Sequence, residues 1–197
     1  MITFRLVDAL PTERLAELQQ DPEKPDDTER RKRLEELMDA GHGACHLRNP
    51  RIARLVEGAL WHFDGALYRL LAWVVMPNHV HTLIEPLAGS SLSRIMHAWK
   101  SFTAKEANNV LGLSGRFWQP EYYDRAIRDE RHWRSAVEYI HENPVRAGLV
   151  GRCEEWPYSS ASREYLEPRA GGTPALPAHD GFHDHGAGGT PVLPEGE

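Results

Sequence analysis

The sequence predicts an α+β fold in which helices pack on an antiparallel sheet. Short runs rich in Val, Leu and Ile predict strands at residues 2–7, 67–75 and 79–85. Longer segments with apolar residues three or four positions apart predict helices around these strands. With 197 residues and 41% hydrophobic content, the chain is long enough to bury a substantial core in one domain.

Local signals set the bounds of the first elements. A strand at residues 2–7 precedes a short helix at residues 10–20, in which Thr12 is a candidate N-cap. Residues 21–25 break that helix, and a charged amphipathic helix at residues 26–40 is closed by Gly41.

Asn49 is a candidate cap for a helix at residues 50–63, because Pro50 suits the first helical position. The next two strands are either one long strand interrupted at Pro77 or two strands joined there. Helices follow at residues 91–111 and from Asp129 or Arg131 to Glu142, where Pro144 is expected to end the helix just before it.

Composition divides the chain into a predicted folded domain at residues 1–165 and a tail at residues 166–197. The tail is rich in Gly and Pro, and Gly-Gly-Thr-Pro-Ala-Leu-Pro recurs in it as Gly-Gly-Thr-Pro-Val-Leu-Pro. Such a composition predicts disorder.

The segment from Ala72 to Ile84 carries the first chemical signal. His79 and His81 flank Val80 in an apolar run, so on a strand the two histidines share one face while Val80 points into the core. Imidazole is the commonest metal ligand in proteins. Taken alone, such a pair is more often a hydrogen-bonded or surface pair than a ligand set.

A second signal lies in the last predicted helix. Tyr139 and Asn143 are four positions apart, which places them one above the other on one helix face. A phenol that can act as a nucleophile and an amide oxygen that can bind a metal would therefore lie one turn apart. Each also has a structural explanation, Tyr139 as a core aromatic residue and Asn143 as a helix terminator.

At these residues the chain resembles the REP-associated tyrosine transposases, which belong to the HUH single-tyrosine transposases. The resemblance rests on five blocks in order between Ala72 and Ala161. The blocks are Met-Pro-Asn-His-Val-His at 76–81, Trp-Lys-Ser-Phe-Thr at 99–103, Phe-Trp-Gln-Pro-Glu-Tyr-Tyr-Asp-Arg-Ala-Ile-Arg-Asp-Glu at 117–130, Tyr-Ile-x-x-Asn-Pro-Val-x-x-Gly-Leu-Val at 139–150 and Trp-Pro-Tyr-Ser-Ser at 156–160.

The resemblance implies a ferredoxin-like fold of the HUH endonuclease type and a nuclease that acts on single-stranded DNA. It implies cleavage at hairpin palindromes through a covalent tyrosine link to the 5′ phosphate. Tyr139 matches the nucleophile, and His79, His81 and Asn143 match the metal ligands. It also favours a monomer, although related transposases with exchanged helices are dimers.

The residue types suit that chemistry. Two imidazoles and one amide oxygen are neutral ligands, so they leave the full charge of a divalent ion available to an anionic phosphodiester. Oxygen donors favour Mg²⁺ and the imidazoles favour Mn²⁺, so we expect one of these two ions. The chain has none of the glycine patterns that bind nucleotides, so no nucleotide cofactor is expected.

Two alternative functions remain open. The protein can be a non-catalytic, sequence-specific DNA-binding regulator at repeated palindromes, or a metal phosphodiesterase that forms no covalent intermediate. Tyr122 and Tyr123 are rival nucleophiles, ranked below Tyr139 because neither has a ligand one turn away. The turn-rich segment with His42, Cys45 and His46 has no standard zinc-site spacing and is interpreted as a structural turn.

Charge and context complete the expectations. The net charge is −6, but much of the excess acid lies in the tail, and basic residues alternate with aromatic ones between Arg94 and Arg152. That pattern is typical of single-stranded DNA binding, with Lys100, Arg125 and Arg128 as the expected DNA contacts. The absence of a signal peptide or membrane-spanning run predicts a cytoplasmic, nucleoid-associated protein with no membrane partner.

Overall fold

The computed structural model describes residues 1–10 and 27–166. The chain divides into two compact units, Met1–Glu167 and Pro168–Glu197, of which only the first is described below. The helix predicted at residues 10–20 and the predicted tail lie outside the described residues, apart from Leu10 and Leu166.

The sheet is antiparallel and has the strand order β2-β3-β1-β4. Its strands are β1 (Ile2–Arg5), β2 (Tyr68–Val75), β3 (His79–Pro86) and β4 (Tyr123–Asp124). The region around Pro77 therefore joins two strands rather than interrupting one. The β-α-β-β-α-β succession is that of a ferredoxin-like fold, which confirms the predicted α+β class.

The helices are α2 (Asp27–Asp39), α3 (Pro50–His62), α4 (Leu92–Leu111), α5 (Glu130–Arg146) and the short α6 (Arg163–Leu166). Two 3-10 turns, η1 (His46–Arg48) and η2 (Cys153–Glu155), lie between them. Three helices begin at a side chain that accepts a hydrogen bond from a free backbone N–H: Asn49 before α3, Ser91 before α4 and Asp129 before α5.

Helix α5 passes through Pro144, so the prediction that the helix ends before this residue was wrong. A proline inside a helix loses one backbone hydrogen bond and crowds the carbonyl four residues earlier. Here it lies in the last turn, is buried, and accepts a bond from Leu149 N–H at 2.9 Å. Because Pro144 lies at the helix end, few backbone hydrogen bonds are disturbed, and the burial of its ring outweighs their loss.

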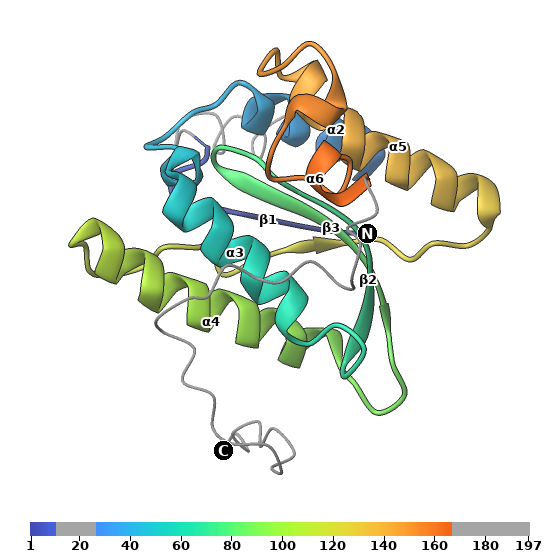
Figure 1. Cartoon of the computed structure of the whole chain (residues 1–197), viewed down its shortest axis with the longest axis horizontal. Helices are drawn as coiled ribbons and strands as arrows, with labels where there is room; N and C mark the ends of the chain where they lie inside the picture. Colours follow the sequence, from blue (N-terminus) through green and yellow to red (C-terminus); the bar gives the residue numbers. More distant parts are fainter. Residues whose placement is uncertain (11–26, 167–197) are drawn as a thin grey trace. The chain divides into compact units, whose positions relative to one another are not determined.

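Alternation along the strands gives the sheet two apolar faces, and the helices that cover them lie on opposite sides of it (Figure 1). Helices α3 and α4 cover one face, against Phe4, Trp73 and Val80. Helix α5 covers the other, where Ile140 packs on apolar side chains of β2 and β3. The second face carries the predicted site residues.

The outer edge of β2 is covered by residues 156–160, which follow α5. Val75 N–H donates to the Tyr158 carbonyl at 2.8 Å, and Ser160 N–H donates to the Trp73 carbonyl at 3.0 Å. The Trp156 indole N–H donates to the Val75 carbonyl at 3.0 Å. Among the described residues, no helix is both long and apolar enough to cross a membrane.

Candidate functional site

The two histidines of β3 point toward α5, as the alternation of the strand predicts. His79 and His81 are almost completely buried, and their ring centroids are 4.7 Å apart. Val80 lies between them in the chain and packs into the core on the other face. The sheet therefore holds both imidazoles side by side in a site closed to bulk water.

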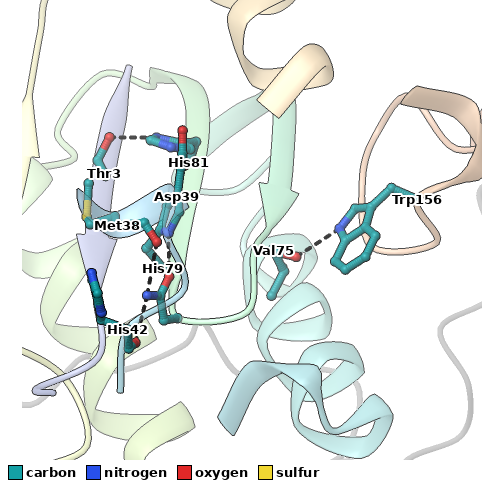
Figure 2. Close-up of polar contacts among 9 residues, drawn as sticks. Thr3, Met38, Asp39, His42, Val75, His79, His81 and Trp156 are labelled. Carbon is teal, nitrogen blue, oxygen red and sulfur yellow. Dashed lines mark hydrogen bonds and ion pairs between the residues drawn. The ribbon is translucent and has the colours of Figure 1, made fainter. Parts of the chain in front are cut away.

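The orientation of His79 is set by its neighbour Asn78. The Asn78 amide nitrogen donates to the carbonyls of Met38 at 3.1 Å and His42 at 3.0 Å. This leaves the Asn78 oxygen facing His79 Nδ1 at 2.8 Å, so Nδ1 must carry the proton that it donates. The neutral His79 ring consequently has its lone pair on Nε2, the atom that faces Asp39 (Figure 2).

His81 is held from the adjacent strand. Thr3 of β1 lies directly opposite it in the antiparallel register, and the Thr3 hydroxyl is 2.8 Å from His81 Nδ1. Both histidines thus bind the protein through Nδ1, and Nε2 of each is buried without a hydrogen-bond partner. Partners on the far nitrogen are what orient metal-binding histidines in proteins.

Helix α5 brings the predicted nucleophile and the predicted amide ligand to the histidines. The Tyr139 ring lies 5.2 Å from the His81 ring, measured between centroids. Asn143 is fully buried one turn further on, close enough to His79 to raise the pKa of that ring against the larger lowering by burial. The structure therefore brings all four predicted residues, His79, His81, Tyr139 and Asn143, into one site.

Six buried polar atoms of these residues and of Asp39 have no hydrogen-bond partner. They are Nε2 of His79, Nε2 of His81, the side-chain oxygen and nitrogen of Asn143, the Tyr139 hydroxyl and Oδ1 of Asp39. Leaving a buried polar atom unpaired costs about 1–3 kcal/mol of folding free energy, so these atoms destabilise the fold unless a ligand binds them. Imidazole nitrogens and an amide oxygen are ligands for a divalent cation, so the donor set fits a metal ion.

The charge states of these side chains are compatible with metal binding. Burial lowers the pKa of His79 to about 3, and it holds the pKa of His81 well below its usual value, so both rings are neutral at neutral pH. Burial, with Glu35 next in importance, raises the pKa of Asp39 to about 7. Neutral imidazoles can bind a metal. The raised pKa of Asp39 shows that no nearby positive charge fully balances the negative charge of its ionised form.

A pocket of about 490 Å³ leads to Tyr139 between α2 and α5. Glu35, Glu36 and Asp39 line it from α2, whereas Tyr139 and Arg146 line it from α5. The Arg146 guanidinium lies over the Tyr139 ring, 5.3 Å from its centroid.

The Tyr139 hydroxyl has a raised pKa. Burial is the main cause, and the carboxylates of Glu35 and Asp39 add to it, whereas Arg146 opposes it. The phenol is therefore protonated at neutral pH and needs added positive charge before it can act as a nucleophile.

The sequence did not single out Asp39, Arg146 or the supporting role of Asn78. Asp39 lies forty residues before the histidines in a helix with many charges, so no local pattern marks it. Arg146 was placed beyond the end of the helix because α5 was expected to stop before Pro144. Asn78 had a visible signal, since it is a polar residue immediately before the histidines in an apolar run.

The residues predicted to contact DNA lie elsewhere. The Lys100 ammonium donates to the backbone carbonyls of Gln119 and Pro120, so it ties α4 to the segment before β4. Arg125 and Arg128 are exposed in the segment between β4 and α5. Of the rival tyrosines, Tyr123 lies on β4 beneath the Arg5 guanidinium, 5.6 Å from its ring centroid, and Tyr122 lines a separate pocket.

The segment with His42, Cys45 and His46 is a turn, as predicted. Gly41, Gly43 and Cys45 all have positive φ there. The side chains of His42, Cys45 and His46 are not arranged to hold a metal. This turn supplies the His42 carbonyl that orients Asn78, so it supports the site indirectly.

Gly43→Ala should destabilise the protein far more than Gly89→Ala. Both glycines have a φ close to +80°, which costs a side chain about 1 kcal/mol. At Gly43 a Cβ would also lie 2.3 Å from the Asp8 carbonyl oxygen, whereas nothing lies within 4 Å of a Cβ at Gly89. Urea denaturation should show a loss of about 2–4 kcal/mol for Gly43→Ala. Equal losses in the two variants would contradict the close approach of this turn to Asp8.

Part of the chain is similar to a known protein family. Residues 54–143 match the family described as "Transposase IS200 like". A REP-associated tyrosine transposase of Escherichia coli (strain K12) is 32% identical over 97 residues, which cover 49% of this chain and 56% of that protein. A relative from Haemophilus influenzae is 27% identical over 107 residues, covering 49% of this chain and 61% of the relative. The chain thus spans somewhat over half the length of these curated relatives.

One solved structure shares the fold. It is a REP-associated tyrosine transposase bound to a REP hairpin, with a TM-score of 0.51 and 21% identity, covering 97% of this chain and 90% of that one. The matched family segment contains both β3 histidines, Tyr139 and Asn143. Residues 54–143 are therefore similar to the IS200-like transposase family, and the chain resembles REP-associated tyrosine transposases over about half of its length.

Proposed function

We propose that this protein is a metal-dependent endonuclease and strand transferase that acts on single-stranded DNA at hairpin palindromes. The observation that carries the proposal is the position of Tyr139, whose ring packs on one of two buried histidines with free Nε2 atoms. A tyrosine kept only for packing would not need two unpaired imidazole nitrogens beside it.

The hairpin substrate is inferred from relatives. The related solved structure contains a REP hairpin, and the Escherichia coli relative is a REP-associated tyrosine transposase. Arg125 and Arg128 are exposed in the segment that precedes α5. We assign these two basic side chains to contacts with DNA phosphates.

We assign His79, His81 and Asn143 as ligands of Mg²⁺ or Mn²⁺. When bound, such an ion stabilises negative charge on a phosphodiester and lowers the pKa of a nearby hydroxyl. The acidic lining of the pocket, from Glu35, Glu36 and Asp39, would by itself repel DNA phosphates. Cation binding is what makes this site suitable for an anionic substrate.

The chain's own groups then perform the transfer. The Tyr139 oxygen attacks the scissile phosphorus and forms an O–P bond, while the bond from phosphorus to the 3′ oxygen breaks. The phenolic proton passes to a base, for which the carboxylates beside the hydroxyl are the available groups, and the departing 3′ oxygen takes up a proton. Arg146, over the Tyr139 ring, offsets negative charge that develops next to it.

Such a step leaves the phosphate on Tyr139 at the 5′ end of the departing strand. The phosphotyrosine retains the energy of the original phosphodiester, so a free 3′ hydroxyl can reverse the reaction and rejoin DNA. No nucleotide cofactor is needed for either direction.

The test uses a single-stranded DNA hairpin taken from palindromes flanking the gene, with a label 3′ of the cleavage site. The protein is incubated with Mn²⁺ or with a chelator and separated on a denaturing protein gel. A labelled band at the protein mass that depends on Mn²⁺ is the expected result. Cleavage without this band would indicate a hydrolase, and binding without cleavage would indicate a DNA-binding regulator. Either outcome would overturn the proposal.

A further inference from the structure

A carboxylate from α2 faces the histidine pair, and no sequence motif accounts for it. Asp39 Oδ1 lies 3.6 Å from His79 Nε2, and Figure 2 shows Asp39 reaching His79 from its own helix. Asp39 Oδ1 and His79 Nε2 are both buried without a hydrogen-bond partner. Two polar atoms thus face each other without bonding.

The hydrogen bonds around His79 show why these atoms do not bond. Because the Asn78 amide is fixed by the Met38 and His42 carbonyls, His79 must donate from Nδ1. Nε2 of the neutral ring is then an acceptor, and an ionised Asp39 carboxylate has only acceptor atoms. Two acceptors repel each other, and a positively charged species between them, either a proton or a metal ion, removes that repulsion.

The spacing suits a shared metal ion better than a hydrogen bond. N–H···O hydrogen bonds are about 2.7–3.2 Å long, shorter than the separation observed. Bonds from divalent ions to nitrogen or oxygen are about 2.1 Å long, so two ligand atoms of one ion lie within about 4.2 Å of each other. The 3.6 Å between Asp39 Oδ1 and His79 Nε2 satisfies that limit.

The backbone around Asp39 also favours a cation. Asp39 is the last residue of α2, whose final turn contains no basic residue. The free carbonyls at a helix C-terminus carry partial negative charge. The carboxylates of Glu35 and Glu36 line the same pocket, and Arg146 supplies the positive charge on its opposite wall.

We propose that Asp39 is an additional, anionic ligand of the divalent ion held by His79, His81 and Asn143. This inference rests on the metal site of the proposed function and extends it. The protein would then bind its ion with one negative charge rather than with neutral ligands alone. The ion would also join α2 to β3 and α5, so metal binding would fix the wall of the pocket through which DNA reaches Tyr139.

Titration calorimetry with Mn²⁺ alone tests this inference without DNA or catalysis. Asp39→Asn keeps the shape of the side chain and removes its charge, and it should weaken Mn²⁺ binding by about tenfold or more. Glu36→Gln is the matched control, because Glu36 lines the same pocket and makes no contact with His79 in this structure. We expect the control to change the affinity by less than about twofold.

The outcomes separate this inference from the proposed function. Loss of Mn²⁺ binding in His79→Ala together with unchanged affinity in Asp39→Asn would overturn the Asp39 ligand and leave the histidine site intact. Failure of the unmodified protein to bind Mn²⁺ would overturn the metal site as a whole. Equal weakening by Asp39→Asn and Glu36→Gln would show a general effect of pocket charge and would also overturn the direct ligand.

A second measurement distinguishes direct binding from a long-range charge effect. Water-proton relaxation reports how many water molecules coordinate a bound Mn²⁺ ion. At saturating Mn²⁺, Asp39→Ala should add one coordinated water, because water replaces the missing carboxylate oxygen. An unchanged number of waters would overturn the proposal even if the affinity had fallen. Thermal unfolding in chelator confirms that each variant is folded.

Discussion

Tyr139→Phe should abolish covalent attachment of the protein to hairpin DNA, with a loss of cleavage of about 10³-fold or more. The substitution removes only the hydroxyl oxygen that would bond to phosphorus and keeps the ring that packs against His81. DNA binding should remain within about twofold, because no other contact changes. Gel shift of the hairpin measures binding, and the denaturing gel measures covalent attachment.

Tyr122→Phe and Tyr123→Phe are the matched controls for this experiment. Both tyrosines lie outside the histidine site, Tyr122 in a separate pocket and Tyr123 under Arg5. Each variant should retain the labelled band. If Tyr139→Phe kept the band and one of the controls lost it, the nucleophile would be reassigned to that tyrosine.

Trp99→Ala should reduce the free energy of unfolding by about 3–5 kcal/mol, the largest stability effect that we expect. Trp99 is 2% exposed and stacks on Phe4 between α4 and the sheet. Its indole N–H donates to the Tyr68 hydroxyl at 2.9 Å, which in turn donates to the Leu60 carbonyl at 2.6 Å. The substitution leaves a cavity in the core and removes the hydrogen bond to the Tyr68 hydroxyl.

Trp133→Ala is the control, because Trp133 is 41% exposed on α5. It should cost less than about 1 kcal/mol in urea denaturation monitored by circular dichroism. Trp99→Phe should give an intermediate loss, since it keeps most of the volume and removes the N–H donor. A loss for Trp99→Ala as small as that for Trp133→Ala would show that the α4 face of the sheet is not the main core.

The sequence predicted those features of the fold that local patterns determine. Alternation placed His79 and His81 on one strand face, and helical spacing placed Tyr139 and Asn143 on one face of α5. The candidate cap Asn49 and the expected helix at residues 91–111 mark the starts of α3 and α4 almost to the residue. Each of these depends on residues within one turn or one strand.

Long-range features were not predictable in the same way. The choice between one strand and two around Pro77 depended on pairing across the hairpin. The course of α5 through Pro144 depended on burial of that residue, which overrides its local preference. The approach of Asp39 to His79 depends on how α2 packs on the sheet, and no periodicity within α2 encodes that contact.

The cover over the edge of β2 has a consequence for the solubility of truncated forms. An unpaired strand edge offers free N–H and C=O groups to a second chain and can seed self-association. Residues 158–160 bond to Trp73 and Val75 at this edge, and Trp156 closes its end. A protein shortened to end at Val150 would expose this apolar strand and should aggregate. A protein ending at Glu167 retains the cover and should not aggregate. The segment after α5 therefore prevents β2 from pairing with a strand of another molecule.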